Sequence, residues 1–151
     1  LNEALNKTYI GYGPQGGEAM ARQAVQDKNA QGMSAGSMAT RTAAKASAAY
    51  DNSDWDLIDA KKTGKKVADM PAAALPPPMQ AMKPAEREAF VEEKSKERAE
   101  LQAKIGKLAK DRESFVATET KKQASKGGKS LDDAVIESAK SKAEASSYVF
   151  E

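Results

Sequence analysis

The chain has 151 residues and a formal net charge of +2, and it contains no histidine and no cysteine. General bases that act near neutral pH are usually histidines, and tight transition-metal sites usually need histidine or cysteine. Alanine supplies 29 residues, against 20 for leucine, isoleucine, valine and phenylalanine together. Because alanine favours helix and buries little surface, this composition predicts thin helices, no cofactor and no enzyme active site.

The balanced charge also restricts the class of partner. A net charge of +2 does not produce the one-signed field that nucleic-acid binding normally needs. No apolar run approaches the length of about 18 residues that a membrane span requires. We therefore expect no nucleic acid, no membrane span and no small-molecule substrate, and a protein partner or self-association instead.

The first half of the chain predicts a helix end, a strand and a long helix. Residues 1–6 are typical of a last helical turn, and residues 8–12 form a β-type run that the glycine-rich turn at 13–17 closes. Residues 18–50 contain no proline and are rich in alanine. They predict one long helix, weakened near Gly32 and Gly36.

The second half predicts a short helix, a loop and two further helices. Asp54 is placed to cap a short helix at 55–60, and the proline-rich residues 61–83 predict a loop in which Pro76-Pro77-Pro78 is a stiff spacer. Pro84 suits the first position of a helix that runs to about Lys122, and a last helix follows at 131–146, capped by Ser130. Tyr148-Val149-Phe150 is too short to assign.

Apolar residues in the second long helix recur at heptad spacing. Leu101, Leu108 and Phe115 are seven residues apart, and Val91 and Ile105 fill the alternate positions. This spacing is typical of a helix that packs lengthwise on another, and the alanine-rich face of residues 18–50 offers the partner. The predicted fold is mainly α, a long antiparallel helical hairpin with two short helices and a short N-terminal β-strand. The predicted segments are 1–17, 18–62, 63–83 and 84–151.

Two motifs suggest binding chemistry but lack the required context. Residues 11–16 read G-x-G-x-x-G, yet no second strand and no acidic ribose ligand follow, so a strand-to-helix turn is favoured over a dinucleotide site. Four aspartates lie within residues 51–59, but the glycine and glutamate of a calcium loop are absent there. Helix capping and surface charge explain these aspartates better than a metal site. Trp55 is interpreted as an anchor that docks the short helix, with a partner hot spot as the alternative.

The order of several segments resembles a known family. Residues 1–13 resemble the final helix and strand of bacterial von Willebrand factor type A domains. Residues 50–60, the Arg98-Ala99-Glu100-Leu101-Gln102 run and the Tyr148-Val149-Phe150 ending resemble the helical region that follows this domain in a group of bacterial exported proteins. The resemblance implies a periplasmic or extracellular location. The Asp-x-Ser-x-Ser loop of the family's metal site does not occur in this chain, so no metal ligand is assigned.

The resemblance also implies an interaction site. Residues 8–12 would be an edge strand with unpaired N–H and C=O groups, open to another strand, which makes Tyr9 and Tyr12 candidate interaction residues beside Trp55. The predicted function is a non-enzymatic helical interaction or scaffolding module attached to a type A domain. A self-assembling structural subunit is the alternative, and an enzyme that uses only carboxylates, lysine and tyrosine is a third hypothesis.

Overall fold

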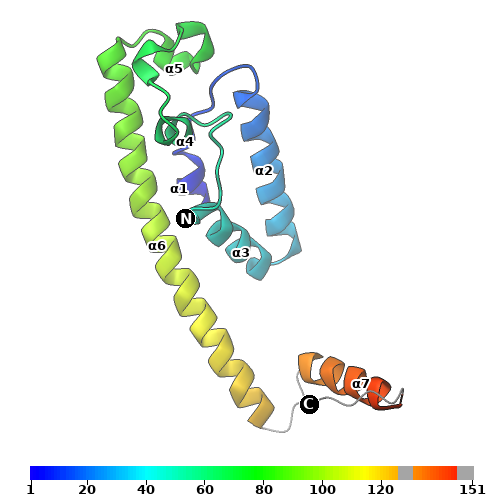
Figure 1. The fold of residues 1–151 in the computed structure, drawn as a ribbon. Coiled ribbons are helices and arrows are strands. Elements are labelled where there is room, and N and C mark those ends of the chain that lie inside the picture. Colours follow the sequence, from blue (N-terminus) through cyan, green and yellow to red (C-terminus); the bar gives the residue numbers. More distant parts are fainter. Residues whose placement is uncertain (126–130, 146–151) are drawn as a thin grey trace. The chain divides into compact units, whose positions relative to one another are not determined.

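The computed structural model describes residues 1–125 and 131–145, and these are mainly helical (Figure 1). Contacts group the chain into two units, Leu1–Ala109 and Lys110–Glu151. The predicted mainly helical class is confirmed. The elements in chain order are α1 (Asn2–Asn6), α2 (Gly16–Met33), α3 (Ala35–Ala46), α4 (Leu57–Lys62), two single 3-10 turns (Val67–Asp69 and Ala72–Ala74), α5 (Pro77–Gln80), α6 (Pro84–Ser125) and α7 (Leu131–Ala145).

The segment predicted as one helix over residues 18–50 is broken at Ser34. Ser34 is in an extended conformation, and its hydroxyl oxygen accepts a 2.9 Å hydrogen bond from the Ser37 backbone N–H, so it ends α2 and caps α3. Gly32 and Gly36 flank the break, and glycine weakens a helix there. Helices α2 and α3 pack against each other. The predicted antiparallel hairpin of two long helices is therefore not confirmed.

The predicted strand at residues 8–12 is replaced by a single bridge. Gly11 makes an isolated antiparallel bridge with Asp56, and no strand is present in residues 1–125 or 131–145. A strand needs successive bridges along both segments. Here the opposite segment turns into α4 at Leu57, so the pairing stops after one bridge.

The turn before α2 depends on a close approach of two glycines. A Cβ atom added to Gly16 would lie 2.7 Å from the Gly11 carbonyl carbon, whereas a Cβ added to Gly17 would meet no atom within 4 Å. We expect Gly16→Ala to lower the free energy of unfolding by about 1–3 kcal/mol because backbone must move aside. Gly17→Ala is the matched control and is expected to raise it by about 0.4–1 kcal/mol. Urea denaturation of both variants measures the difference, and equal effects would contradict this packing.

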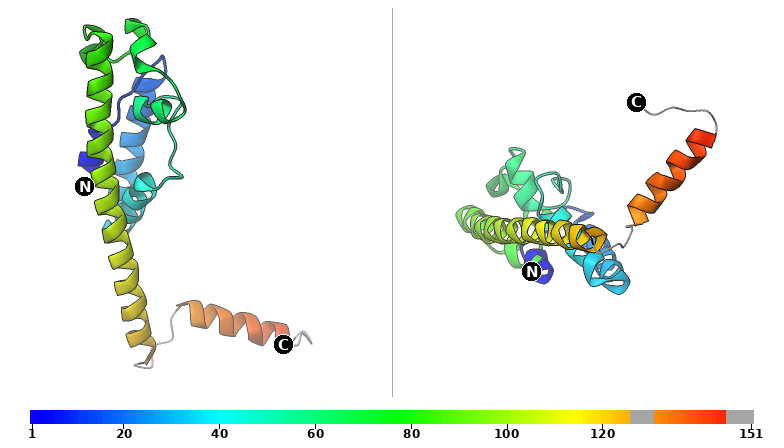
Figure 2. Two further views of the ribbon diagram at one scale, coloured as in Figure 1. Left: turned by 60° about the vertical axis from the view of Figure 1, so that its left-hand side comes forward. Right: turned by 90° about the horizontal axis from the view of Figure 1, so that it is seen from below.

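The core of the first unit lies between residues 84–109 of α6 and the helices α1, α3, α4 and α5 (Figures 1 and 2). One cluster joins Val91 of α6 to Leu57 and Ile58 of α4 and to Met79 of α5. A second cluster joins Ile105 of α6 to Leu5 of α1 and to Tyr9, with Ala43, Ala46, Tyr50, Trp55 and Leu101 partly buried around it. Residues 84–109 of α6 thus cover α1 and α4.

The short helix and the proline-rich region differ in detail from their predictions. Helix α4 begins at Leu57 rather than Trp55, because Asp56 and not Asp54 accepts the capping hydrogen bond, from the Asp59 N–H. The region predicted as a loop contains the 3-10 turns and α5, which begins at Pro77, where a proline needs no helical N–H partner. Helix α6 begins at Pro84 as predicted.

The heptad positions of α6 divide into buried and exposed groups. Val91 and Ile105 are buried and Leu101 is half-buried, but Leu108 is 48% exposed and Phe115 is 66% exposed. Leu108 and Phe115 therefore do not pack as the heptad spacing predicts. The buried cluster that α6 forms with residues of α1 and α3 includes Ile105 and Leu101 but not Leu108. In the second unit, α7 begins at Leu131 as predicted and ends at Ala145. The predicted Ser130 cap and Tyr148-Val149-Phe150 lie outside the described residues.

Candidate binding cleft

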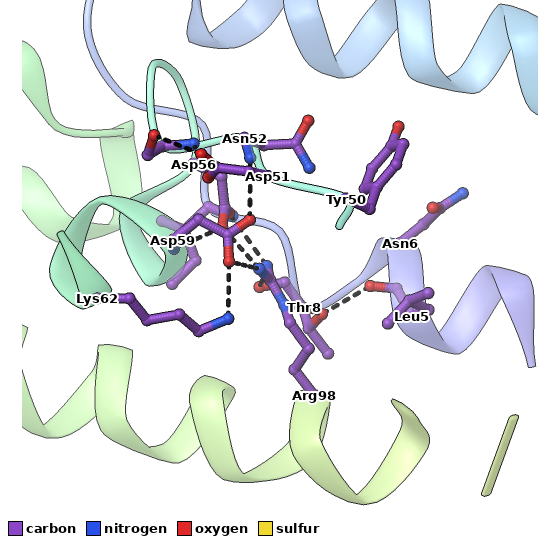
Figure 3. A network of polar contacts seen from close by, with 12 residues as sticks. Leu5, Asn6, Thr8, Tyr50, Asp51, Asn52, Asp56, Asp59, Lys62 and Arg98 are labelled. Atoms are coloured by element: carbon purple, nitrogen blue, oxygen red, sulfur yellow. Dashed lines mark hydrogen bonds and ion pairs between the residues drawn. The ribbon is translucent and has the colours of Figure 1, made fainter. Parts of the chain in front are cut away.

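A buried arginine holds together three distant parts of the first unit (Figure 3). The Arg98 side chain is 2% exposed, and its Nη1 and Nη2 atoms donate to the two Asp56 carboxylate oxygens at 2.6 and 3.1 Å. Its Nε atom donates to the Thr8 hydroxyl at 3.0 Å, and Nη2 also donates to the Thr8 carbonyl at 2.9 Å. The guanidinium carbon lies 4.1 Å from the centre of the Tyr9 ring. This bidentate, stacked geometry is one that lysine cannot reproduce.

Asp56 links Arg98 to the extended segment at residues 9–12, which follows the turn at Thr8. One carboxylate oxygen accepts a 2.8 Å hydrogen bond from the Ile10 N–H, and the other caps α4 through the Asp59 N–H at 3.1 Å. Asp56 is fully buried, so each of these partners offsets the loss of its hydration. The Arg98 network, formed by Arg98, Asp56 and Thr8, therefore fixes the segment against α4 and α6.

A second buried ion pair links α2 and α3, and side chains of α1 form hydrogen bonds with it. The Lys45 side chain is fully buried, and its ammonium lies 2.8 Å from Asp27 Oδ2. Arg41 Nε lies 2.5 Å from Asp27 Oδ1, and the amides of Asn2 and Asn6 donate to Asp27 Oδ2 at 2.8 and 2.7 Å. Lys45 also donates to the side-chain oxygens of Asn2 and Asn6. Side chains from three helices thus satisfy one carboxylate and one ammonium.

Burial and hydrogen bonding shift the pKa values of both members of this pair. Burial alone would raise the pKa of Asp27, but hydrogen bonds from Lys45 and three other side chains outweigh it and hold the pKa well below its ordinary value. Burial lowers the pKa of Lys45, and the Asp27 carboxylate partly offsets this effect. The network stabilises the ionised form of Asp27, which is the form that holds the three helices together.

An apolar cleft of about 410 Å³ borders the extended segment. Its walls are residues 9–13, residues 73–79, the start of α2 at Gly17 and Met20, and Phe90 of α6. Pockets of 300–1,000 Å³ with apolar and aromatic walls are typical ligand sites. The Arg98 network holds one wall, and a hydrogen bond of 2.8 Å from the Gly13 N–H to the Ala74 carbonyl joins that wall to residues 73–79.

Arg87 holds the proline-rich wall in place. Its guanidinium is largely buried and donates to the carbonyls of Met82 at 3.0 Å, Met70 at 2.8 Å and Gln80 at 3.4 Å. A single α6 side chain thus ties both ends of the segment that carries residues 73–79. The cleft therefore lies between two walls that are each anchored by an arginine of α6.

The predicted interaction residues are placed differently from the expectation of an exposed edge strand. Tyr9 is 6% exposed and Tyr12 is 8% exposed, so both side chains belong to the core, although both border the cleft. Burial raises the pKa of the Tyr9 hydroxyl. The Tyr12 hydroxyl donates to the Ser53 carbonyl at 2.6 Å. Trp55 is half-buried, its ring centre lies 5.5 Å from that of Tyr9, and it packs against the buried cluster that contains Tyr9.

Sequence reasoning missed the other walls of the cleft. The sequence alone indicates only a stiff spacer at Pro76-Pro77-Pro78. Met20 lies on α2 and Phe90 and Lys94 on α6, and residues so far apart in sequence form no joint local pattern. The cleft walls do not include Val91, Leu101 or Ile105. Val91 belongs to the buried cluster that also contains the wall residues Tyr12 and Met79.

In residues 1–125 and 131–145, no cluster of three or more acidic side chains is arranged to hold a metal ion. Over the same ranges, no helix combines the length and the apolar character that crossing a bilayer requires. Comparison with known proteins finds no matching family model, no matching curated protein and no matching solved structure.

Proposed function

We propose that this chain is a non-enzymatic helical interaction module that binds a segment of a partner protein in the cleft. The observation that carries the proposal is the apolar cleft of about 410 Å³, whose two walls are held rigidly by Arg98 and Arg87. Pre-organised walls reduce the ordering cost of binding, which favours recognition of a short segment. The walls offer apolar contact and backbone groups, which suit a peptide.

The proposal is tested by filling the cleft. Ala73 is exposed and forms part of a wall, so Ala73→Trp is expected to occupy the cleft and weaken the binding of selected peptides by about tenfold or more. Ala72→Trp is the matched control, because Ala72 is an exposed neighbour in the same 3-10 turn and does not form a wall. The peptides come from a phage-displayed random library selected on the full chain, and fluorescence anisotropy measures their affinities.

The affinities of the two variants decide whether the cleft is the binding site. Weak binding to the Ala73→Trp protein with unchanged binding to the Ala72→Trp protein supports the cleft as the site. Equal affinities for the two variants, or a library that yields no binder, would contradict the proposed function. Circular dichroism of both variants confirms that each retains the helical content of the parent chain.

The wider setting of the module is also a proposal. We propose that it accompanies a type A domain in an exported bacterial protein, and the support is the resemblance of residues 1–13, in which helix α1 is followed by an extended segment. The sequence of the complete parent gene tests this directly. An upstream Asp-x-Ser-x-Ser loop and an export signal are expected, and a parent that lacks both would contradict the association and the periplasmic or extracellular location.

A further inference from the structure

The extended segment beside the cleft has one paired edge and one open edge. Hydrogen bonds of 2.8 Å from the Tyr12 N–H to the Trp55 carbonyl and 2.9 Å from the Leu57 N–H to the Ile10 carbonyl lie on the paired edge. In an extended chain, alternate residues direct their backbone groups to opposite edges. Gly11 therefore directs its N–H and its carbonyl away from Leu57, and within residues 1–125 and 131–145 neither group has a hydrogen-bond partner.

The open edge faces the proline-rich wall, which cannot satisfy it. The Gly13 N–H, on the same edge as Gly11, donates to the Ala74 carbonyl, so residues 73–79 lie alongside this edge. Pro76, Pro77 and Pro78 carry no N–H group and cannot donate to the Gly11 carbonyl. Gly11, Gly13 and residues 73–79 all line the cleft. An N–H and a carbonyl of one residue, both unpaired, form the pair of groups that a hydrogen-bonded residue of an antiparallel strand exchanges.

The walls around this edge suit alternating side chains of an extended chain. Met20 lies next to Gly11, since a Cβ on Gly11 would come within 2.8 Å of its sulfur. Phe90 of α6 and Met79 of α5 supply further apolar surface in the cleft. Methionine and aromatic walls adapt to different apolar side chains. An incoming strand would therefore place apolar side chains against these walls and its backbone against Gly11.

The charges that border the cleft are all positive. Lys7 and Lys94 take part in its walls, and no Asp or Glu does. Lys7 is exposed and has no ion-pair partner within the described ranges, whereas Lys94 also contacts Glu97 at 2.7 Å. A carboxylate on the ligand would complement these ammonium groups, with Lys7 as the uncommitted one.

We infer that the occupant of the cleft is an acidic peptide in extended conformation, which pairs with the backbone of Gly11 as an added β-strand and places a carboxylate near Lys7. This inference rests on the proposed function and names its ligand. Main-chain pairing supplies binding without demanding one sequence, apolar side chains fill the walls, and the carboxylate selects among peptides.

The composition of the selected peptides tests the charge. Selection from the random library is expected to enrich peptides with at least one Asp or Glu beside alternating apolar residues. Lys7→Glu is expected to lower the affinity for the best peptide about tenfold at low salt. Lys28→Glu is the matched control, because Lys28 is an exposed lysine outside the cleft. Selected peptides without acidic residues, or equal effects of the two variants, would overturn the inference while leaving the proposed function standing. A library without binders would overturn both.

Backbone pairing is tested on the best peptide separately. Methylation of one peptide nitrogen at a time removes one hydrogen-bond donor at a time. We expect methylation of the nitrogen whose N–H bonds to the Gly11 carbonyl to lower the affinity by about tenfold or more. Hydrogen exchange measured by NMR is expected to slow at the Gly11 amide when the peptide binds, while the amide of Gly32, which lies in α2 outside the cleft, serves as the reference. Uniform tolerance of N-methylation together with unchanged exchange at Gly11 would rule out strand addition.

Discussion

Replacing Arg98 with methionine is expected to lower the free energy of unfolding by about 3–5 kcal/mol, because the fully buried Asp56 carboxylate is left without its cation. The same change removes the hydrogen bonds to the Thr8 hydroxyl and carbonyl, so the extended segment loses its attachment to α6. Guanidinium denaturation followed by far-ultraviolet circular dichroism measures the loss.

Two further variants make the Arg98 prediction specific. Arg112→Met is the control, since Arg112 is exposed two heptads further along α6, and its effect is expected to stay within about 0.5 kcal/mol. Asp56→Asn is expected to lower the free energy of unfolding less in the Arg98→Met protein than in the parent protein. The neutral amide removes the carboxylate charge that Arg98→Met leaves unpaired. A stable Arg98→Met protein, or strictly additive effects of the two changes, would show that this pair does not hold the segment.

Replacing Asp27 with asparagine is expected to lower the free energy of unfolding by about 3 kcal/mol near neutral pH. The variant keeps the side-chain volume but leaves the fully buried Lys45 ammonium without a counter-charge, and Arg41 loses its closest partner. Asp54→Asn is the control, because Asp54 is an exposed aspartate that makes no ion pair among the described residues. Chemical denaturation of the three proteins under one buffer condition makes the comparison.

The same variant carries a pH signature with a definite sign. The pKa of Asp27 is lower in the folded protein than in the unfolded chain, so ionised Asp27 stabilises the folded state above the unfolded pKa. This contribution is expected to decline as the pH falls from about 5 towards the folded-state pKa, because the unfolded chain then binds a proton that the folded protein does not. The gap in stability between the parent and Asp27→Asn should therefore shrink on acidification. A gap that is constant from about pH 7 to about pH 3 would contradict this.

Part of the cleft could be anticipated from the chain, and part could not. The β-type composition of residues 8–12 predicts a strand, and the resemblance makes Tyr9 and Tyr12 candidate interaction residues. Both residues border the cleft, but their segment forms one bridge and not a strand. The opposite wall at residues 73–79 could not be placed beside it, because proline content specifies local stiffness and carries no information about which distant segment lies alongside. The hydrogen bond from Gly13 to Ala74 spans that distance and is visible only in the folded chain.

The heptad pattern of α6 shows the same limit. Ile105 and Leu108 occupy equivalent positions in the predicted seam, yet Ile105 is 4% exposed and Leu108 is 48% exposed. A periodic pattern indicates which face of a helix is apolar, but the extent of the neighbouring elements decides how much of that face is covered. Leu5 and Tyr9 contact Ile105, and this cluster does not reach Leu108.

Local chemistry by itself determined the helical class and several helix boundaries: Pro84 starts α6, and the glycine and serine residues around position 34 weaken the helix where it breaks. Such signals act within one or two turns, so they can be recognised in the chain. Only the tertiary structure decided that Arg98 and Lys45 would be buried, since long cationic side chains are exposed unless partners compensate for their lost hydration. Those partners, Asp56 and Asp27, lie far away in sequence, and folding alone brings them together.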